Sequence, residues 1–357
     1  MNKKIGVLTF HNGPNYGGFM QAWHMRHAIH DIGHSCSVIN YMHPVHMTSN
    51  KVCNSIRNLG DLKARLHWMI KTKPFQEPIR SLSDDPFTDD VNQVPWNRYS
   101  GIVVGSDVVF DFQNPKFGSD RAYFGACPAQ QDLPFMSYAA SCGMAEVDGE
   151  IPEFCSSLRR FSTIGVRDEA TSRLVNRVTG RRPAMNLDPT WLSEDPVADD
   201  WKRPRGRYVL LYGRRLPPEW AAQLTSFCRK KNFRIVSAGN PDKAADEVHR
   251  RLTPFQWVDL FRRAEATIVG TLHGTMYSIK YNKPFILINN DVIRQKVKDA
   301  VDLTGMGFRR VEQHELTPNL IELLEPGAGV LPEIPKALRK ESLEFLRNGV
   351  SGMLSNG

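Results

Sequence analysis

The sequence predicts an α/β protein with two domains, each built on a parallel β-sheet, that face each other across a cleft. Three observations predict this fold class. The 357 residues exceed the roughly 250–300 residues at which a single hydrophobic core stops growing. Short apolar runs alternate with amphipathic segments, as in Rossmann-like domains whose parallel sheets are covered by helices. Residues 186–204 are rich in proline and aspartate, separate two such series, and are interpreted as the linker.

The N-terminal domain is predicted over residues 1–185. A strand over residues 4–10 leads through a turn rich in glycine and asparagine into a helix over about residues 18–31, whose apolar positions recur with helical spacing. A second strand follows at residues 37–41, and a strand, helix and strand in this order form a βαβ unit. Three more apolar runs are predicted as strands, at residues 101–104, 135–139 and 163–166. A helix that ends near residue 178 follows the last of them.

A polar stretch over about residues 44–97 interrupts this domain; it contains several prolines and one predicted helix near residues 61–71. It is interpreted as an insertion or a mobile flap. The C-terminal domain is predicted over residues 205–330, and residues 331–357 are predicted as a C-terminal helical tail. Strands and helices of the C-terminal domain are expected to alternate over residues 208–212, 218–231, 234–237, 254–263, 267–269, 275–281 and 285–288.

Composition excludes several classes of protein. Hydrophobic residues make up 41% of the chain and charged residues 24%, as in globular domains rather than disordered, collagen-like or coiled-coil chains. The apolar runs are far shorter than the roughly 20 residues of a membrane span, and the first residues lack a signal-peptide pattern. A cytoplasmic protein is therefore expected. The six cysteines form no C-x-x-C pair, which argues against a zinc site or a thioredoxin-like motif.

The charge balance favours anionic partners. Lysine and arginine number 46 against 38 aspartates and glutamates, which gives a net charge of +8. This excess favours anionic ligands or peripheral association with an anionic membrane surface. No helix-turn-helix, zinc-finger or RNA-binding signature accompanies it, so no nucleic-acid partner is expected.

Residues that follow the predicted strands are the candidate site, because ligands of open α/β sheets bind beyond the carboxyl ends of the strands. Asn12, Asn15, Tyr16 and Gly17 follow the first strand. Backbone amides at the start of the next helix can hold an anion or a sugar hydroxyl there. A plain tight turn would explain the same residues.

Ser106 and Asp107 follow the predicted strand at residues 101–104. A hydroxyl and a carboxylate at a strand end form a polar edge of the candidate site. Asp107 can act as a base on a hydroxyl or cap a following helix, and the sequence leaves both roles open.

The segment VGTLHGT, residues 269–275, carries the strongest signal for function. It connects an apolar strand to a helix, and Gly270 and Gly274 let the backbone come close to a ligand. His273 lies at the positive end of the helix dipole, which draws anions. Most of the other histidines come before residue 68. They are interpreted as solvated side chains, mainly on the helix face that carries His27, His30 and His34; His43 and His46 follow.

Six sequence blocks occur in a fixed order: KIGVLTFHNGPNYGGFMQAW, GSDVVF, SYAASCG, VRDE, LDPTWL and GTLHGTMYSIKYNKPFI. Their order and spacing resemble those of the polysaccharide pyruvyl transferase family over about residues 3–310. The resemblance implies a GT-B-like architecture. It also implies transfer of a pyruvyl (carboxyvinyl) group from phosphoenolpyruvate to a sugar diol, which forms a pyruvate ketal and releases phosphate. The acceptor would be a sugar of a cell-surface glycan, free or lipid-linked.

The resemblance also implies roles for particular residues. His273 matches the family's general acid/base, with Asp107 as the second catalytic candidate. Neither a metal nor a cofactor is implied, since phosphoenolpyruvate is a co-substrate. In family members with established donor use an arginine can stand where this chain has Thr271. The donor-binding candidates are Arg167, Arg214, Arg215, Thr271, Leu272, Gly274 and Thr275, and the acceptor-binding candidates are Asn12, Asn15, Tyr16, Gly17 and Ser106.

Two other functions remain open at this level. A GT-B-type glycosyltransferase, or another sugar-modifying transferase, would use the same cleft with a nucleotide-sugar donor. A non-catalytic relative would bind a glycan or a partner without turnover. The fold alone does not separate these functions, because one fold hosts many chemistries.

Overall fold

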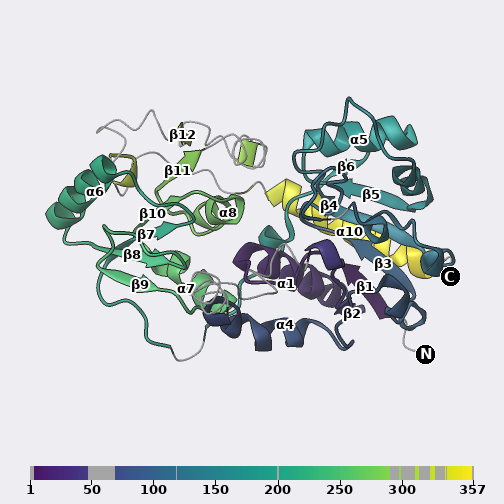
Figure 1. The fold of residues 1–357 in the computed structure, drawn as a ribbon, viewed down its shortest axis with the longest axis horizontal. Helices are drawn as coiled ribbons and strands as arrows, with labels where there is room; N and C mark the ends of the chain where they lie inside the picture. Colours follow the sequence, from purple (N-terminus) through teal and green to yellow (C-terminus); the bar gives the residue numbers. More distant parts are fainter. Residues whose placement is uncertain are drawn as a thin grey trace, which may run out of the picture. The chain divides into compact units, whose positions relative to one another are not determined.

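The computed structural model describes residues 4–46, 69–117, 119–198, 201–289, 297–298, 310–312, 322–325, 334 and 336–355. The chain divides into two units, each of which is described by itself (Figure 1). Unit 1 comprises Met1–Glu194 and Lys336–Gly357, and unit 2 comprises Asp195–Pro335. Among the described residues, each unit contains one six-stranded sheet whose strand pairs are all parallel. The predicted class, two parallel-sheet α/β domains, is confirmed.

The sheet of unit 1 has the strand order β2-β1-β3-β4-β5-β6. Strand β2 pairs with one side of β1, and β3, the next strand along the chain, pairs with the other side. The strand order therefore reverses between β1 and β3. Such a switch point is where open α/β sheets bind ligands. The bounds of the strands are Lys4–Leu8 for β1, Ser35–Val38 for β2, Gly101–Val104 for β3, Phe135–Ala140 for β4, Thr163–Val166 for β5 and Ala184–Met185 for β6.

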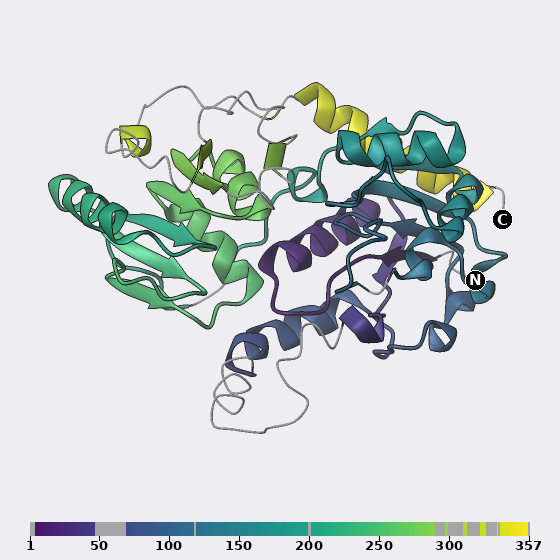
Figure 2. The same ribbon diagram turned by 45° about the horizontal axis from the view of Figure 1, so that its top comes forward.

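The helices of unit 1 cover this sheet. Helix α1 begins after Asn15, whose side chain accepts a hydrogen bond from Gly18 N, and it connects β1 to β2. Helix α10 lies against β3 and β4, with Leu346, Val350 and Met353 buried (Figures 1 and 2). The predicted C-terminal helix therefore forms part of unit 1. The bounds of the helices are Tyr16–Asp31 for α1, Gln76–Leu82 for α4, Glu169–Thr179 for α5 and Lys336–Ser355 for α10.

The described part of the predicted insertion, residues 69–97, is not a flap. Several of its apolar side chains are buried, among them Phe75, Leu82 and Trp96, whereas Met69 and Phe87 are exposed. Thr88 N donates a hydrogen bond to Asn40 O at 3.0 Å, which ties the segment to the end of β2. The flap interpretation is wrong for these residues because it considered the polar composition and overlooked the spaced apolar anchors. The helix predicted near residues 61–71 falls mostly outside the described residues.

The first part of the predicted linker also belongs to unit 1. Leu187, Trp191 and Leu192 are buried. The Arg339 side chain of α10 donates two hydrogen bonds to Leu192 O, at 2.8 and 3.0 Å. The boundary between the units consequently falls after Glu194, within the predicted 186–204 segment but not at its start.

The sheet of unit 2 has the order β12-β11-β10-β7-β8-β9. Its strand order reverses between β7 and β10, which is the corresponding switch point. Trp220, Trp257 and Tyr277 are fully buried between the sheet and its helices. The bounds are Tyr208–Tyr212 for β7, Arg234–Ala238 for β8, Glu247–His249 for β9, Ala266–Val269 for β10, Phe285–Asn289 for β11, Arg310–Glu312 for β12, Pro218–Lys231 for α6, Pro254–Arg263 for α7 and Leu272–Lys280 for α8.

Candidate functional site

The turn between β10 and α8 is held by its own hydroxyl groups. Thr271 is the N-cap of α8, and its Oγ1 accepts a hydrogen bond from Gly274 N at 3.0 Å. The Thr275 hydroxyl is buried and donates to Thr271 O at 2.9 Å. Because of this cap, α8 begins at Leu272 and not at Thr275 as the sequence analysis expects. The two threonines therefore shape the turn, and their contact with a donor stays a prediction.

His273 lies in the first turn of α8, one residue after Leu272. Its side chain is 8% exposed, so it is nearly buried but still reaches the surface. The first turn of α8 carries no acidic side chain. Its backbone amides and the helix dipole therefore present positive potential that no helix carboxylate offsets, which favours an anion beside His273.

Arg214 lies beside this turn. Strands β7 and β10 pair in parallel, and Gly270 N donates to Tyr212 O at 3.0 Å. The loops that follow the two strands therefore begin side by side at the same edge of the sheet. A Cβ placed on Gly270 would lie 2.6 Å from Cγ of Arg214, and one on Gly213 would lie 2.7 Å from Cγ2 of Thr271. Only glycine permits this approach. The switch point of unit 2 thus combines a half-exposed arginine with the first turn of α8.

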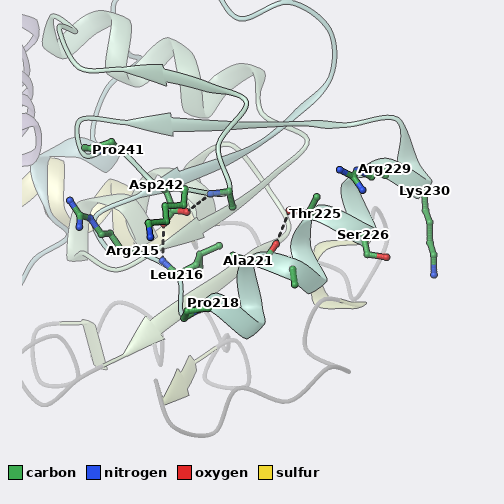
Figure 3. A pocket seen from close by; sticks show the side chains of 13 residues that line it. Arg215, Leu216, Pro218, Ala221, Thr225, Ser226, Arg229, Lys230, Pro241 and Asp242 are labelled. Atoms are coloured by element: carbon green, nitrogen blue, oxygen red, sulfur yellow. Dashed lines mark hydrogen bonds between the residues drawn. The ribbon is translucent and has the colours of Figure 1, made fainter.

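Arg215 points elsewhere, although it follows Arg214 directly. It is exposed and lines a groove of about 1000 Å³ along α6 (Figure 3). Arg214 is not among the residues that line this groove. Both arginines are predicted to bind the donor. Only Arg215 lines the groove, and the contact of either arginine with a donor stays a prediction.

At the switch point of unit 1, Gln21 of α1 joins the ends of β1 and β3. Its amide nitrogen donates to Thr9 Oγ1 and Phe10 O, both at 2.9 Å. Its amide oxygen accepts from the Ser106 hydroxyl at 2.8 Å. Ser106 is fully buried, so its hydroxyl organises this edge, and its role in acceptor binding stays a prediction.

Asp107 occupies a turn at the end of β3. Its Oδ1 accepts from Val108 N at 2.8 Å, and its backbone oxygen accepts from Ser141 N at 2.9 Å. No helix begins at this turn, so the capping role that the sequence leaves open is wrong. The half-exposed carboxylate remains as a candidate base.

Arg167 forms an ion pair within unit 1. Its Nη1 donates to Asp188 Oδ2 at 2.8 Å, and both side chains are almost completely buried. Burial acts to lower the pKa of Arg167, but the carboxylates of Asp188, Asp107 and Asp168 outweigh it and raise the pKa. Because three carboxylates already compensate its charge, a role in holding an anionic donor is disfavoured. The ion pair instead connects the VRDE and LDPTWL blocks.

The residues of the first turn mostly serve the fold. Asn15 caps α1, and the buried Tyr16 ring packs on Phe75 with 4.8 Å between ring centroids. Gly17 is buried, and Asn12 is half-buried between β1 and α1. Their contacts with an acceptor stay a prediction.

Sequence reasoning missed the burial of two histidines, His11 and His46. Of these, His46 lies close enough to Asp107 for the carboxylate to act on its pKa. His11 is buried, and its ring nitrogens lie 3.0 Å from Thr9 O and 3.3 Å from Asn40 Oδ1. Burial lowers the pKa of His11. His46 packs between Phe10 and Phe117, with centroid separations of 4.6 and 5.0 Å.

Burial also lowers the pKa of His46 to about 4, although Asp107 acts to raise it. The solvated interpretation is therefore wrong for His46, whereas His30 is exposed on α1 as predicted. His11 directly follows β1, a position that could have singled it out. No local pattern signals His46, because its neighbours come from other parts of the chain.

Within the parts of the chain that the structure describes, no three His, Cys, Asp or Glu side chains are placed to hold a metal ion. None of the described helices is both long enough and apolar enough to cross a membrane.

Comparisons with known proteins give one family and one fold. The family model for polysaccharide pyruvyl transferase matches residues 15–292. No curated protein matches the sequence. Solved structures that resemble the chain include UDP-GlcNAc 2-epimerase from Methanocaldococcus jannaschii, with 10% identity, a TM-score of 0.53, and coverage of 98% of this chain and 100% of that one.

Two further epimerase structures agree. A putative UDP-N-acetylglucosamine 2-epimerase from Listeria monocytogenes has 10% identity, a TM-score of 0.53 and coverage of 98% and 96%. UDP-GlcNAc 2-epimerase from Neisseria meningitidis has 9% identity, a TM-score of 0.50 and coverage of 98% and 100%. At such low identity these likenesses show the fold alone, which is the GT-B fold of two Rossmann-like domains.

Proposed function

This chain belongs to the polysaccharide pyruvyl transferase family, and we propose that it transfers a pyruvyl group from phosphoenolpyruvate to a sugar diol of a cell-surface glycan. The product is a pyruvate ketal, and inorganic phosphate is released. The observation that carries the proposal is the switch point of unit 2, where Arg214 lies beside the first turn of α8 and its His273.

The donor carries a carboxylate and a phosphate, so its binding site must supply positive charge. Arg214 offers a planar guanidinium that can bind either group through two parallel hydrogen bonds. The backbone amide of Leu272 offers a further donor at the positive end of the helix dipole, next to the Gly274 amide that Thr271 caps. These groups support a donor site in unit 2, with Thr271 acting through the shape of the turn.

His273 would supply acid/base catalysis. Protonation of C3 of phosphoenolpyruvate builds positive charge at C2, and the first sugar hydroxyl forms a C2–O bond there. The C2–O bond to phosphate then breaks, and the second hydroxyl closes the ketal. Of the two hydroxyl protons, one ends on the C3 methyl group and one on phosphate, so the reaction balances without a cofactor. Acid/base catalysis of this kind contributes roughly 10²–10⁴ in rate.

The acceptor is proposed to bind at the carboxyl edge of the unit 1 sheet. Asp107 would take the proton of a sugar hydroxyl. His11 and His46 stay neutral at pH 7 because burial lowers their pKa values. Arg167 is already compensated by carboxylates. Among the described residues named here, neither the arginine nor the two histidines supply an uncompensated positive charge, which suits an uncharged sugar better than it suits the donor.

Location and carrier form part of the same proposal. The net charge of +8 supports peripheral association with an anionic membrane surface, where a lipid-linked acceptor would be presented. A cytoplasmic site of action is included in the same proposal.

A thermal-shift titration with phosphoenolpyruvate, beside a panel of nucleotide-sugars, tests the function. A ligand that binds only the folded state stabilises it by about 2.7 kcal/mol at one hundred times its dissociation constant. We expect stabilisation by phosphoenolpyruvate, and reduced stabilisation in Arg214→Ala. Stabilisation by a nucleotide-sugar alone would replace the proposal with a glycosyltransferase, and Thr271 would then mark the change of donor.

A further inference from the structure

A groove of about 1000 Å³ runs along α6 of unit 2, between this helix and the loop that follows β8 (Figure 3). Small side chains of α6 form its floor, among them Ala221, Ala222 and Ser226. Four cationic side chains line it: Arg215, Arg229, Lys230 and Lys243.

These four cations differ from several others in unit 2. All four are exposed, and none forms an ion pair with another described residue. Other cations of the same unit do have carboxylate partners, at nitrogen–oxygen distances of 2.7–3.0 Å: Arg203, Arg207, Lys231, Arg234 and Lys280. Positive charge that no carboxylate compensates is thus gathered around the groove.

The groove is held in shape without a ligand. Asp242 is the one carboxylate among its described lining residues, and it is buried. Its two oxygens accept hydrogen bonds from Leu216 N at 2.8 Å and from Ala244 N at 2.9 Å. Both bonds are drawn as dashed lines in Figure 3. Asp242 therefore ties the loop after β7 to the loop after β8, and both of its oxygens accept hydrogen bonds from backbone amides.

We propose that this groove binds an extended acidic saccharide chain. Arg215 lies before the start of α6 and Lys230 near its end, and the residues from Pro218 to Lys230 span about 18 Å of helix. Charges at both ends of such a groove fit a chain that carries carboxylates at intervals, and arginine binds carboxylates with two parallel hydrogen bonds. The small side chains between them let sugar rings approach the helix closely.

The saccharide identity of the ligand rests on the proposed function. Each ketal adds one carboxylate to the acceptor, so a polymer that has already been modified is acidic. Binding of such a polymer in the groove would hold the product chain on the enzyme between transfers. The groove would then favour acceptors that belong to a polymer over isolated sugars.

Two other polyanions fit the groove less well. Single-stranded nucleic acid binds on aromatic stacking platforms, and no aromatic side chain is among the described lining residues. A bilayer surface favours a basic face with large apolar side chains that insert, and the exposed large apolar side chains of the described residues lie outside this groove.

The test measures binding of a fluorescent oligogalacturonide, which carries a carboxylate on every sugar, to the full chain. The background variant is His273→Ala, so that turnover plays no part. We expect Arg229→Gln/Lys230→Gln to weaken binding at least tenfold. The matched control, Arg207→Gln/Lys231→Gln, removes two ion-paired cations of the same unit and should change binding less than threefold. Ser226→Trp, which fills the floor at an exposed position, should weaken binding without changing the charge.

The outcomes separate the possibilities. Equal loss in both double variants would show an effect of net charge alone and overturn the proposal, as would equal binding of a neutral oligosaccharide. Tighter binding of single-stranded RNA or of anionic vesicles would also overturn it. If phosphoenolpyruvate fails to bind while the oligogalacturonide binds as expected, the proposed function fails and the groove assignment stands.

Discussion

Each sheet places an arginine after a strand, and the two arginines have opposite surroundings. Arg167 follows β5, is buried, and is compensated by Asp188 and two further carboxylates. Arg214 follows β7, is half-exposed, and lies beside the first turn of α8, which has no acidic residue. The same residue type after a strand therefore serves the fold in one unit. In the other unit it lies beside a helix N-terminus whose dipole favours an anion.

The comparison assigns different ligands to the two edges. At the unit 2 edge the first turn of α8 carries no acidic side chain, so its helix dipole suits an anionic donor. At the unit 1 edge, Arg167 is compensated, and His11 and His46 are neutral at pH 7.

The largest effect is expected at the unit 2 edge. His273→Gln should lower the rate of phosphate release from phosphoenolpyruvate by roughly 10²–10⁴, because it removes the acid/base group. His30→Gln, at an exposed position on α1, is the control and should keep the wild-type rate. A normal rate in His273→Gln, with the fold intact by circular dichroism, would remove this histidine from the chemistry.

Removal of Arg167 should damage the fold. Arg167→Met leaves Asp188 buried without its cation, and the free energy of unfolding should fall by about 3–5 kcal/mol in urea denaturation. Arg173→Met breaks the exposed pair with Asp148 and should cost less than about 1 kcal/mol. If Arg167→Met is stable but no longer binds phosphoenolpyruvate, Arg167 is a donor ligand after all and the contrast between the edges fails.

The neutral character of the unit 1 edge predicts a dependence of stability on pH. The pKa of His46 is about 4 in the folded protein and about 6.5 when unfolded, so only the unfolded state gains a proton between these values. Stability from neutral His46 is therefore complete above pH 6.5 and is lost as the pH falls toward 4, by up to about 3 kcal/mol. Urea denaturation at pH 7 and pH 4 should show a smaller loss for His46→Phe. Equal losses of stability in the wild type and in His46→Phe would show that a group other than His46 titrates over this pH range.

Arg214→Ala should weaken phosphoenolpyruvate binding by about 1.5–3 kcal/mol, the range for hydrogen bonds to charged groups, with little change in stability. Isothermal titration calorimetry measures the affinity. Arg205→Ala, at an exposed position of unit 2, is the control. If Arg215→Ala weakens phosphoenolpyruvate binding as much as Arg214→Ala does, both arginines belong to one donor site.

The smallest effect concerns the two helix caps. Thr271→Ala and Asn15→Ala each remove an N-cap and should each lower stability by about 1 kcal/mol in thermal unfolding. If Thr271 acts only through the turn, the loss of donor affinity in Thr271→Ala will be small. A loss of affinity as large as that of Arg214→Ala would show that its hydroxyl binds the donor.

Local sequence determined much of the fold. The strands over residues 101–104, 163–166 and 208–212 and the helices over 218–231 and 254–263 have their predicted bounds. Prolines at the first helical position and continuous apolar runs specify such elements, because both act through neighbouring residues. The position of His273 just after a strand was equally visible in the sequence.

Tertiary structure decided the remainder. The short strands β6, β9 and β12 lie at or near sheet edges and carry no apolar run, so only pairing with a neighbouring strand defines them. The compensation of Arg167 depends on Asp188, and the low pKa of His46 depends on burial between Phe10 and Phe117. The sequence by itself therefore determined where the strands end and which chemical groups follow them. Only the packed structure decided which of those groups are compensated, because compensation depends on residues far away along the chain.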